Sequence, residues 1–183
     1  MGRPGPVRSV LRFLTHPAIA WTLFLATQWA WHLPAAYQLA LTNRWVHYAE
    51  HLTFFGSALL FWWPVIGAAP LGSRLSYPAR LLYTFLAWIP NTLLGAGLTF
   101  APSVLYPLYA ERATAVSTDP LADQMLAGLL MWIPGDLLFV AILLILLYAF
   151  MQQEDHAARR EEAALDAAAL KPASRASNIR AIQ

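Results

Sequence analysis

Long apolar segments separated by short polar stretches dominate the first 150 residues of this chain. Four of them are near the length of about 20 residues that crosses a bilayer core, the first being the shortest. They run from about Pro17 to Leu33, Val46 to Ile66, Pro78 to Ala101 and Gln124 to Phe150. A lone strand would leave its backbone groups unpaired in lipid, so these segments must be helices. The pattern predicts an all-α fold, a polytopic membrane helix bundle with about four transmembrane helices.

Two of the four segments are interrupted near their middles. The third contains Pro90-Asn91, and the fourth contains Pro134-Gly135-Asp136. A broken helix at membrane depth needs polar partners or a cavity, because its freed backbone groups find no water there. An ionised aspartate is costly at this depth, so Asp136 is either protonated or paired. We expect a structural hydrogen bond, for example with Asn91, rather than a step in a proton path.

The chain changes character after residue 150. Residues 1–150 form the predicted bundle, and residues 151–183 form a predicted cytoplasmic tail. The tail is rich in Ala, Glu and Arg from Gln152 to Ala169, and we expect a helix there. Beyond Pro172 no apolar pattern supports a core, so the sequence predicts disorder.

Composition assigns the chain to the membrane class. Of its 183 residues, 58% are hydrophobic and 12% are charged, and that charged share is about half the share in a typical soluble domain. The net charge of +2 is modest, and the basic residues lie in loops and tail, so we expect no nucleic-acid partner. The chain has no cysteine. Any metal must therefore be bound by imidazole, carboxylate, thioether or backbone oxygen.

Basic residues indicate the orientation of the segments. Arg44 and Arg112 fall on one side of the predicted bundle. The other ten Lys and Arg residues fall on the opposite side: Arg3, Arg8, Arg12, Arg74, Arg80, Arg159, Arg160, Lys171, Arg175 and Arg180. Cytoplasmic loops carry the excess of basic residues, so both termini are predicted to be cytoplasmic. The first segment follows basic residues as a signal peptide would, but Leu33-Pro34-Ala35 is a poor cleavage site, so we expect an uncleaved helix.

Residue types that bind metals gather where the second segment begins. His47 and His51 lie four residues apart, so in a helix both imidazoles lean the same way, with the Glu50 carboxylate beside them. Such a pair of histidines can coordinate a metal ion. His32 ends the preceding segment, and the short link makes the two segments neighbours. We expect the three imidazoles to converge at the outer face. The alternative is a set of interfacial histidines that only form hydrogen bonds.

The fourth segment offers two more candidate ligands. Asp123, Ala127 and Met131 are spaced i, i+4 and i+8, so they line one face of a helix. Asp123 is a candidate ligand at the outer surface, although the helix dipole also favours a carboxylate in a first turn. Met131 is a soft thioether within range of an outer site, although a methionine in the core or against lipid is the simpler interpretation.

Two other functions share this pattern. His47-x-x-Glu50-His51 has the spacing of inverted zincins, membrane zinc metalloproteases among them, with the glutamate as general base. That site needs a downstream carboxylate ligand, and Glu111 lies across another whole segment. The runner-up is a membrane electron carrier in which histidines on neighbouring helices bind haem b. The sequence shows neither a nucleophile–base pair nor a cofactor-binding loop, so we do not expect an enzyme.

Motifs in order along the chain resemble the CtaG family of caa-type cytochrome c oxidase assembly factors. The motifs are Trp31-His32-Leu33-Pro34, His47-x-x-Glu50-His51-Leu52-x-Phe54, Leu60-Phe61-Trp62-Trp63-Pro64, Ser76-Tyr77-Pro78-Ala79-Arg80 and Asp123-Gln124-x-x-Ala127-Gly128-x-x-Met131-Trp132-x-Pro134-Gly135. The resemblance covers about Pro17 to Tyr148 and is far more specific than the histidine pair alone. Family members usually carry further spans, including some before the first segment here.

The resemblance implies a multi-pass protein of the bacterial inner (plasma) membrane that supplies or inserts copper during oxidase maturation, as a metallochaperone. The expected partners are cytochrome c oxidase subunits, and a second copy of the chain or another copper protein is a further candidate. The implied copper ligands and acidic partners are His32, His47, His51, Glu50 and Asp123, with Met131 as an additional candidate. Copper suits these residues, because it exceeds other first-row divalent ions in affinity for nitrogen ligands and, as Cu(I), accepts thioether.

Overall fold

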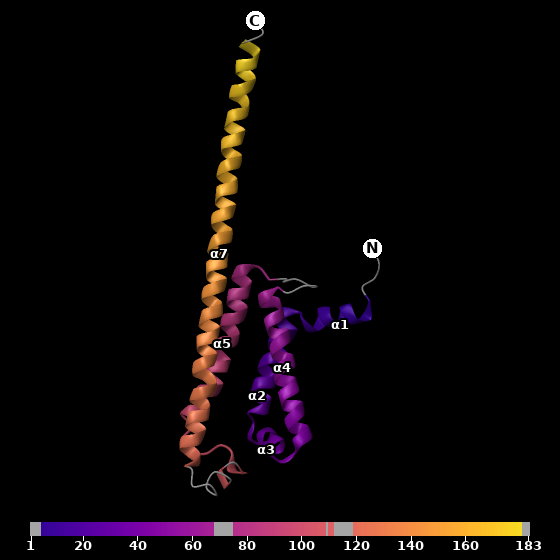
Figure 1. The fold of residues 1–183 in the computed structure, drawn as a ribbon, viewed down its shortest axis with the longest axis vertical. Coiled ribbons are helices and arrows are strands. Elements are labelled where there is room, and N and C mark those ends of the chain that lie inside the picture. The colour runs from indigo at the N-terminus through magenta and orange to yellow at the C-terminus, as the bar shows by residue number, and fades with distance from the viewer. Residues whose placement is uncertain (1–4, 68–74, 109, 112–118, 181–183) are drawn as a thin grey trace. The chain divides into compact units, whose positions relative to one another are not determined.

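Helices make up most of the described part of the chain. The computed structural model describes residues 5–67, 75–108, 110–111 and 119–180, and no residue in these ranges lies in a strand. The all-α prediction is confirmed. Three of the basic residues from which the orientation was predicted lie outside the described residues: Arg3, Arg74 and Arg112. The helices are α1 (Pro6–Leu14), α2 (Pro17–Trp31), α3 (Pro34–Thr42), α4 (Arg44–Ile66), α5 (Tyr77–Thr99) and α7 (Pro120–Arg180), labelled in Figure 1.

The expected apolar segments correspond to observed helices. α2, α4 and α5 begin and end within about two residues of the predicted bounds, and the fourth segment lies inside α7. Two helices were not expected, α1 and α3, each of 9 residues. Both begin with proline at the first helical position, where its fixed φ suits a helix and its missing N–H is not needed. α3 fills the link between α2 and α4.

The chain divides into two compact units, Met1–Leu143 and Leu144–Gln183. The predicted division after residue 150 stays a prediction. α7 begins in the first unit and makes up the described part of the second, where it continues as a helix to Arg180. This differs from the disorder expected beyond Pro172. The Ala-, Glu- and Leu-rich run before Pro172 has high helix propensity and extends the helix past this residue.

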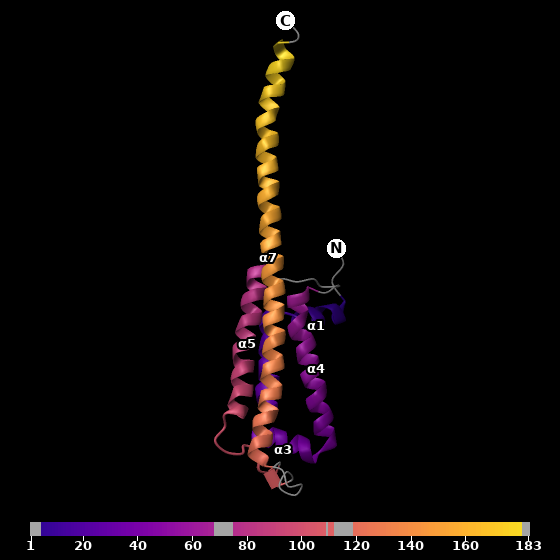
Figure 2. The ribbon, with the colours of Figure 1, turned by 60° about the vertical axis from the view of Figure 1, so that its left-hand side comes forward.

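Aromatic side chains form the core of the first unit. Phe61 of α4 is fully buried. Its ring stacks on Phe24 of α2 at 4.4 Å and on Tyr83 of α5 at 4.9 Å between centroids. The Tyr83 hydroxyl also donates a hydrogen bond to the Phe61 carbonyl oxygen at 3.2 Å. These contacts fix α2, α4 and α5 side by side, as Figures 1 and 2 show.

Within the described residues, two or three spans are long and apolar enough to cross a membrane. α5 and the Pro120–Asp166 part of α7 meet this description singly, and α1 with α2 meets it as a bent pair. α4 has sufficient length, but Arg44, His47, Glu50 and His51 in its first turns lower its hydropathy. The predicted total of four transmembrane helices and the cytoplasmic location of both termini are therefore not confirmed and stay predictions.

The predicted interruptions at the prolines are wrong. α5 continues through Pro90, and α7 continues through Pro134. One proline removes only one N–H from the ladder, and packed neighbours can hold the helix together around it. Asp136 does have a polar partner on α5, but it is Thr92 rather than Asn91: the Thr92 hydroxyl donates to Oδ1 of Asp136 at 2.6 Å.

Small residues let α5 and α7 approach closely. A Cβ added to Gly128 would lie 2.5 Å from Oγ1 of Thr99, and one added to Gly95 would lie 2.5 Å from Cβ of Trp132. The indole N–H of Trp132 donates to Oγ1 of Thr99 at 3.1 Å. Interfaces between membrane helices use small residues in this way. A Cβ added to Gly97, in contrast, would meet no atom within 4 Å.

α1 is amphipathic and meets α2 at a bend of 65°. At helical spacing, Val7, Val10 and Leu11 share one side, and Arg8 and Arg12 share another. None of the residues of α1 is buried. An exposed helix with one apolar and one basic face is typical of segments that lie in the interface of a membrane.

Candidate metal centre

The start of α4 is fixed by a side-chain cap. Oδ1 of Asn43 accepts hydrogen bonds from the backbone N–H groups of Trp45 at 2.9 Å and Val46 at 3.4 Å. Such a cap satisfies amides that have no partner in the first turn of a helix. The helical repeat therefore begins at a defined residue, and it aligns His47 with His51 one turn further on.

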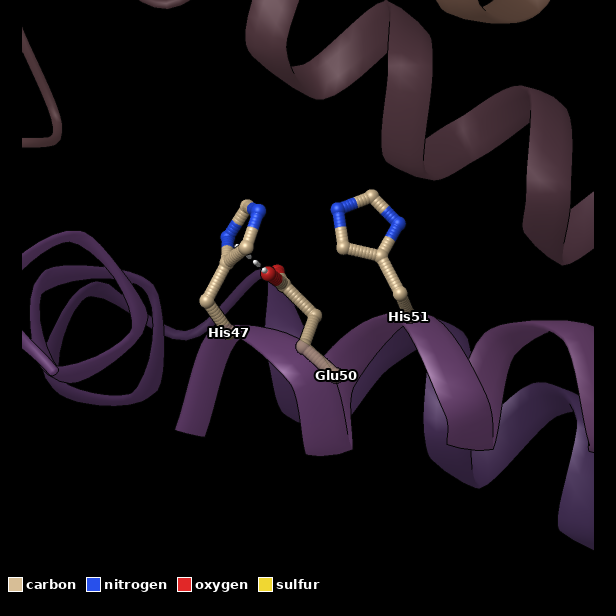
Figure 3. Close-up of side chains that lie close together, drawn as sticks. All are labelled: His47, Glu50 and His51. Carbon is tan, nitrogen blue, oxygen red and sulfur yellow. Dashed lines mark ion pairs between the residues drawn. The ribbon is translucent and has the colours of Figure 1, made fainter. Parts of the chain in front are cut away.

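His47, Glu50 and His51 form a cluster on one side of α4 (Figure 3). Their ligand atoms all lie within 4.8 Å of one another. Nδ1 of His47 is 3.6 Å from Oε2 of Glu50, and the two imidazole centroids are 4.5 Å apart. The side chain of His47 is 49% exposed, whereas that of Glu50 is 13% exposed. Across the described ranges, this is the one group of three His or acidic residues that is close enough to hold a metal ion.

The cluster suits an ion of intermediate softness. Two ligand atoms on a tetrahedral ion, each at about 2.1 Å, lie roughly 3.4 Å apart, and the separation between His47 and Glu50 is 3.6 Å. Two imidazoles and one carboxylate match copper or zinc better than Ca²⁺ or Mg²⁺, which prefer oxygen ligands. The exposed imidazoles have room to rotate onto an ion, and water can complete its coordination.

His32 does not join this cluster. It is the C-terminal cap of α2, and its Nδ1 lies 2.6 Å from the carbonyl oxygen of Gln28. Its ring meets Phe54 edge-on, with centroids 6.1 Å apart. The end of α2 does meet α4, since the indole N–H of Trp31 donates to Oγ1 of Thr53 at 2.9 Å, but the predicted convergence of three imidazoles does not occur in the cluster. The cluster therefore contains Glu50, not His32, as its third member.

His32 instead lines a cavity of about 260 Å³ in the first unit. From α7, Ala127 and Met131 line the same cavity, as the predicted shared face requires. Asp123, the third member of that face, acts electrostatically on Tyr37 in the cavity wall. The remaining lining residues are Tyr37, Leu98, Tyr106 and Gln124.

Two tyrosines in the cavity wall were not identified from the sequence. The rings of Tyr37 and Tyr106 lie 4.3 Å apart between centroids, and the Tyr106 hydroxyl donates to the His32 carbonyl oxygen at 2.9 Å. Burial, followed by the negative charges of Glu50 and Asp123, raises the pKa of Tyr37. Burial, followed by the influence of Tyr37, raises the pKa of Tyr106 to about 12.

Gln124 is a third lining residue, and its hydrogen-bonding role was not predicted from the sequence. It is 4% exposed, and its Oε1 accepts a hydrogen bond from the backbone N–H of Leu105 at 2.8 Å. Its Nε2 donates to the carbonyl oxygens of Ser103 at 3.4 Å and Leu98 at 3.5 Å. An uncharged polar residue near the start of an apolar helix was the available signal, because a buried amide must be hydrogen-bonded. Gln124 ties the segment after α5 to α7.

Comparison with known protein families places the helical bundle in one of them. The family model described as cytochrome c oxidase caa3 assembly factor (Caa3_CtaG) matches residues 4–153. The chain belongs to this family, and the resemblance seen in the sequence motifs is confirmed.

Three mycobacterial proteins are similar to the chain. Uncharacterized protein Mb0105 of Mycobacterium bovis and Uncharacterized protein MT0111 of Mycobacterium tuberculosis are each 27% identical over 154 residues, covering 84% of this chain and 23% of theirs. Uncharacterized protein ML1998 of Mycobacterium leprae is 24% identical over 155 residues, covering 84% of this chain and 24% of its own. The chain thus spans about a quarter of the length of these curated relatives. No solved structure matches it.

Proposed function

We propose that this protein is a membrane-bound, non-catalytic assembly factor that binds copper at the His47–Glu50–His51 cluster and delivers it to a cytochrome c oxidase. The observation that carries the proposal is the set of two imidazoles and one carboxylate on adjacent turns of α4, with ligand atoms within 4.8 Å of one another. Family membership supports a role in the assembly of cytochrome c oxidase. The two imidazoles and the carboxylate support copper as the ion that is carried.

The chemistry of the cluster suits a carrier. Copper binds nitrogen ligands more tightly than the other first-row divalent ions do, so two imidazoles favour it over competitors. The cluster has no thiolate, and His47 and His51 are exposed. An ion held by so few ligands at a surface can be selected and then passed to a receiving protein.

The same geometry favours copper over haem b. A haem with two axial imidazoles takes one from each side of its ring. His47 and His51 project from the same side of one helix, as Figure 3 shows, so the two residues of the cluster cannot be the two axial ligands, and a haem would need its second imidazole from a neighbouring helix. A zinc protease would use Glu50 as general base and would need a further protein ligand. Within the described residues, the cluster has three members and no fourth His or acidic residue.

The location and partners follow from the proposed topology. With both termini in the cytoplasm, the first turns of α4 lie at the outer face of a bacterial plasma membrane. The receiving partner is then an oxidase subunit that exposes its copper site on this face. A second copy of the chain or another copper protein can act as donor.

The test is copper binding by the purified, detergent-solubilised protein. Wild-type protein is expected to bind Cu(II) with an electron paramagnetic resonance spectrum that shows nitrogen coupling. Loss of a residue behind the ligands lowers metal affinity 10- to 100-fold in known sites, so loss of a ligand itself should lower it by about 100-fold or more. His51→Ala is therefore expected to abolish retention, and His156→Ala, an exposed histidine of the second unit, is the matched control.

The same variants can be followed in cells that depend on this protein. Cells with His51→Ala are expected to assemble oxidase with less copper, and external copper should partly restore it. Wild-type protein that binds no copper, or that shows a haem Soret band instead, would contradict the proposal. Equal copper retention by His51→Ala and His156→Ala would contradict the assignment of the cluster.

A further inference from the structure

The cavity beside α2 contains two metal-binding side chains that the cluster does not use. His32 and Met131 both line it, and its volume is about 260 Å³. They come from distant parts of the sequence, at the end of α2 and in α7. A water molecule in the liquid takes up about 30 Å³, so the cavity has room for a metal ion.

The hydrogen bonding of His32 leaves one nitrogen for a ligand. Nδ1 lies 2.6 Å from the carbonyl oxygen of Gln28. A carbonyl oxygen only accepts, so Nδ1 carries the hydrogen and donates it. In the neutral ring Nε2 then holds the lone pair. Metal-binding histidines usually have this arrangement, in which the second nitrogen donates to a carbonyl or carboxylate and orients the ring.

Two other polar groups of the wall have hydrogen-bond partners of their own. The Tyr106 hydroxyl donates to the His32 carbonyl oxygen, and the Gln124 amide binds backbone groups at Leu98, Ser103 and Leu105. These contacts also hold the wall in place. Among the lining residues, one imidazole nitrogen of His32 and the thioether of Met131 are therefore the ligand atoms that suit a soft ion. A nitrogen and a neutral sulfur select soft ions, Cu(I) above all, and disfavour hard oxygen-binding ions.

Nearby carboxylates favour a cation in the cavity. Glu50 and Asp123 act on Tyr37, a lining residue, and help to raise its pKa. Their negative charge therefore reaches the cavity wall. The same negative field that disfavours a phenolate at Tyr37 attracts a positive ion, and the described residues that line the cavity include no Lys or Arg.

We propose that this cavity is a second metal site, selective for a soft monovalent ion, in which Nε2 of His32 and the sulfur of Met131 are the ligands. The choice of Cu(I) as the natural ion rests on the proposed function, whereas the preference for a soft ion rests on the two ligand atoms. The site is separate from the exposed cluster on α4, which has no sulfur ligand.

The experiment loads purified protein anaerobically with Cu(I) supplied as its bathocuproine disulfonate complex, and measures affinity by competition and ligands by X-ray absorption. Wild-type protein is expected to show a sulfur neighbour of copper. Met131→Leu, which keeps side-chain volume, should remove the sulfur signal and lower Cu(I) affinity at least tenfold. Met125→Leu, on a partly exposed methionine of the same helix that does not line the cavity, is the matched control and should change neither quantity.

Further variants distinguish this site from the cluster. The double variant His47→Ala/His51→Ala should lose the Cu(II) spectrum and keep the Cu(I)–sulfur signal. His32→Gln should weaken Cu(I) binding while the Cu(II) spectrum persists. Cu(I) bound without any sulfur neighbour, or a sulfur signal that survives Met131→Leu, would overturn the cavity site. Absence of Cu(II) binding at the cluster, with the sulfur signal intact, would overturn only the proposed function of the cluster.

Discussion

The contact between α5 and α7 makes Gly128 the position where one added methyl group should do the most damage. A Cβ there would lie 2.5 Å from Oγ1 of Thr99, 2.7 Å from the Thr99 backbone nitrogen and 2.9 Å from the Gly95 carbonyl oxygen. Two of these three atoms belong to the backbone, so no side-chain rotation can relieve the clash. Gly128→Ala must therefore push the helices apart and strain the bond from Trp132 to Thr99.

The expected loss can be estimated from two opposing effects. Overpacking in a well-packed interior costs about 1–3 kcal/mol, and the backbone contacts place Gly128→Ala in the upper part of that range. Alanine regains about 0.5–1 kcal/mol over glycine inside a helix. The net effect is a loss of about 2 kcal/mol. The Cβ of Gly97→Ala would meet no atom within 4 Å. This variant should therefore gain only the stability that alanine has over glycine inside a helix.

The free energy of unfolding in mixed detergent micelles, titrated with sodium dodecyl sulfate and followed by circular dichroism, measures the difference. The intrinsic fluorescence of the eight tryptophans, Trp132 among them, gives a second signal of unfolding. Gly128→Ala should unfold at lower denaturant than wild type, and Gly97→Ala at the same or higher denaturant. Equal stability of the two variants would refute the close packing at Gly128.

Three further predictions concern other parts of the first unit. Asp136→Asn keeps an oxygen that can accept from Thr92 and should retain stability, whereas Asp136→Leu should lose about 1 kcal/mol in the same titration; equal losses would contradict a structural role. The pKa of Tyr106 is about 12 in the folded protein and near 10 in the unfolded chain. The contribution of the neutral Tyr106 to the free energy of unfolding is therefore complete below about pH 10 and is lost as the pH rises toward 12. Tyr106→Phe should make the free energy of unfolding depend less on pH between these two values. A fluorophore on Val10→Cys should be shielded from iodide in vesicles with anionic lipid, and one on Ser9→Cys should be quenched; equal quenching would contradict an interfacial α1.

The helices that span apolar segments could be predicted from the sequence because the bilayer fixes their length. α2, α4 and α5 lie where the apolar runs lie. α3 could not be predicted in this way, because nine residues are too few for a clear periodic pattern. The predicted breaks at Pro90 and Pro134 failed for a different reason. Proline weakens a helix locally, but packing against neighbours decides whether the helix continues.

The candidate site also contains one part that could be predicted from the sequence and one part that could not. The alignment of His47, Glu50 and His51 depends only on the helical repeat of α4, so the sequence was sufficient to find it. The position of His32 depends on its contacts with the Gln28 carbonyl oxygen and the Phe54 ring, which the spacing along the chain does not reveal. Met131 was identified from its helix face, but Tyr37 and Tyr106 also line its cavity, and no local pattern relates these tyrosines to it. Contacts between distant residues were the part that the sequence did not reveal.

Glu50 connects the two parts of this region through thermodynamic linkage. It is a member of the cluster, and its charge helps to raise the pKa of Tyr37 in the cavity wall. A cation bound at the cluster neutralises that charge and therefore lowers the pKa of Tyr37. Linkage is reciprocal, so ionisation of Tyr37 strengthens cation binding at the cluster by the same free energy. The ultraviolet titration of one phenol thus becomes a remote reporter of whether the exposed cluster holds its ion.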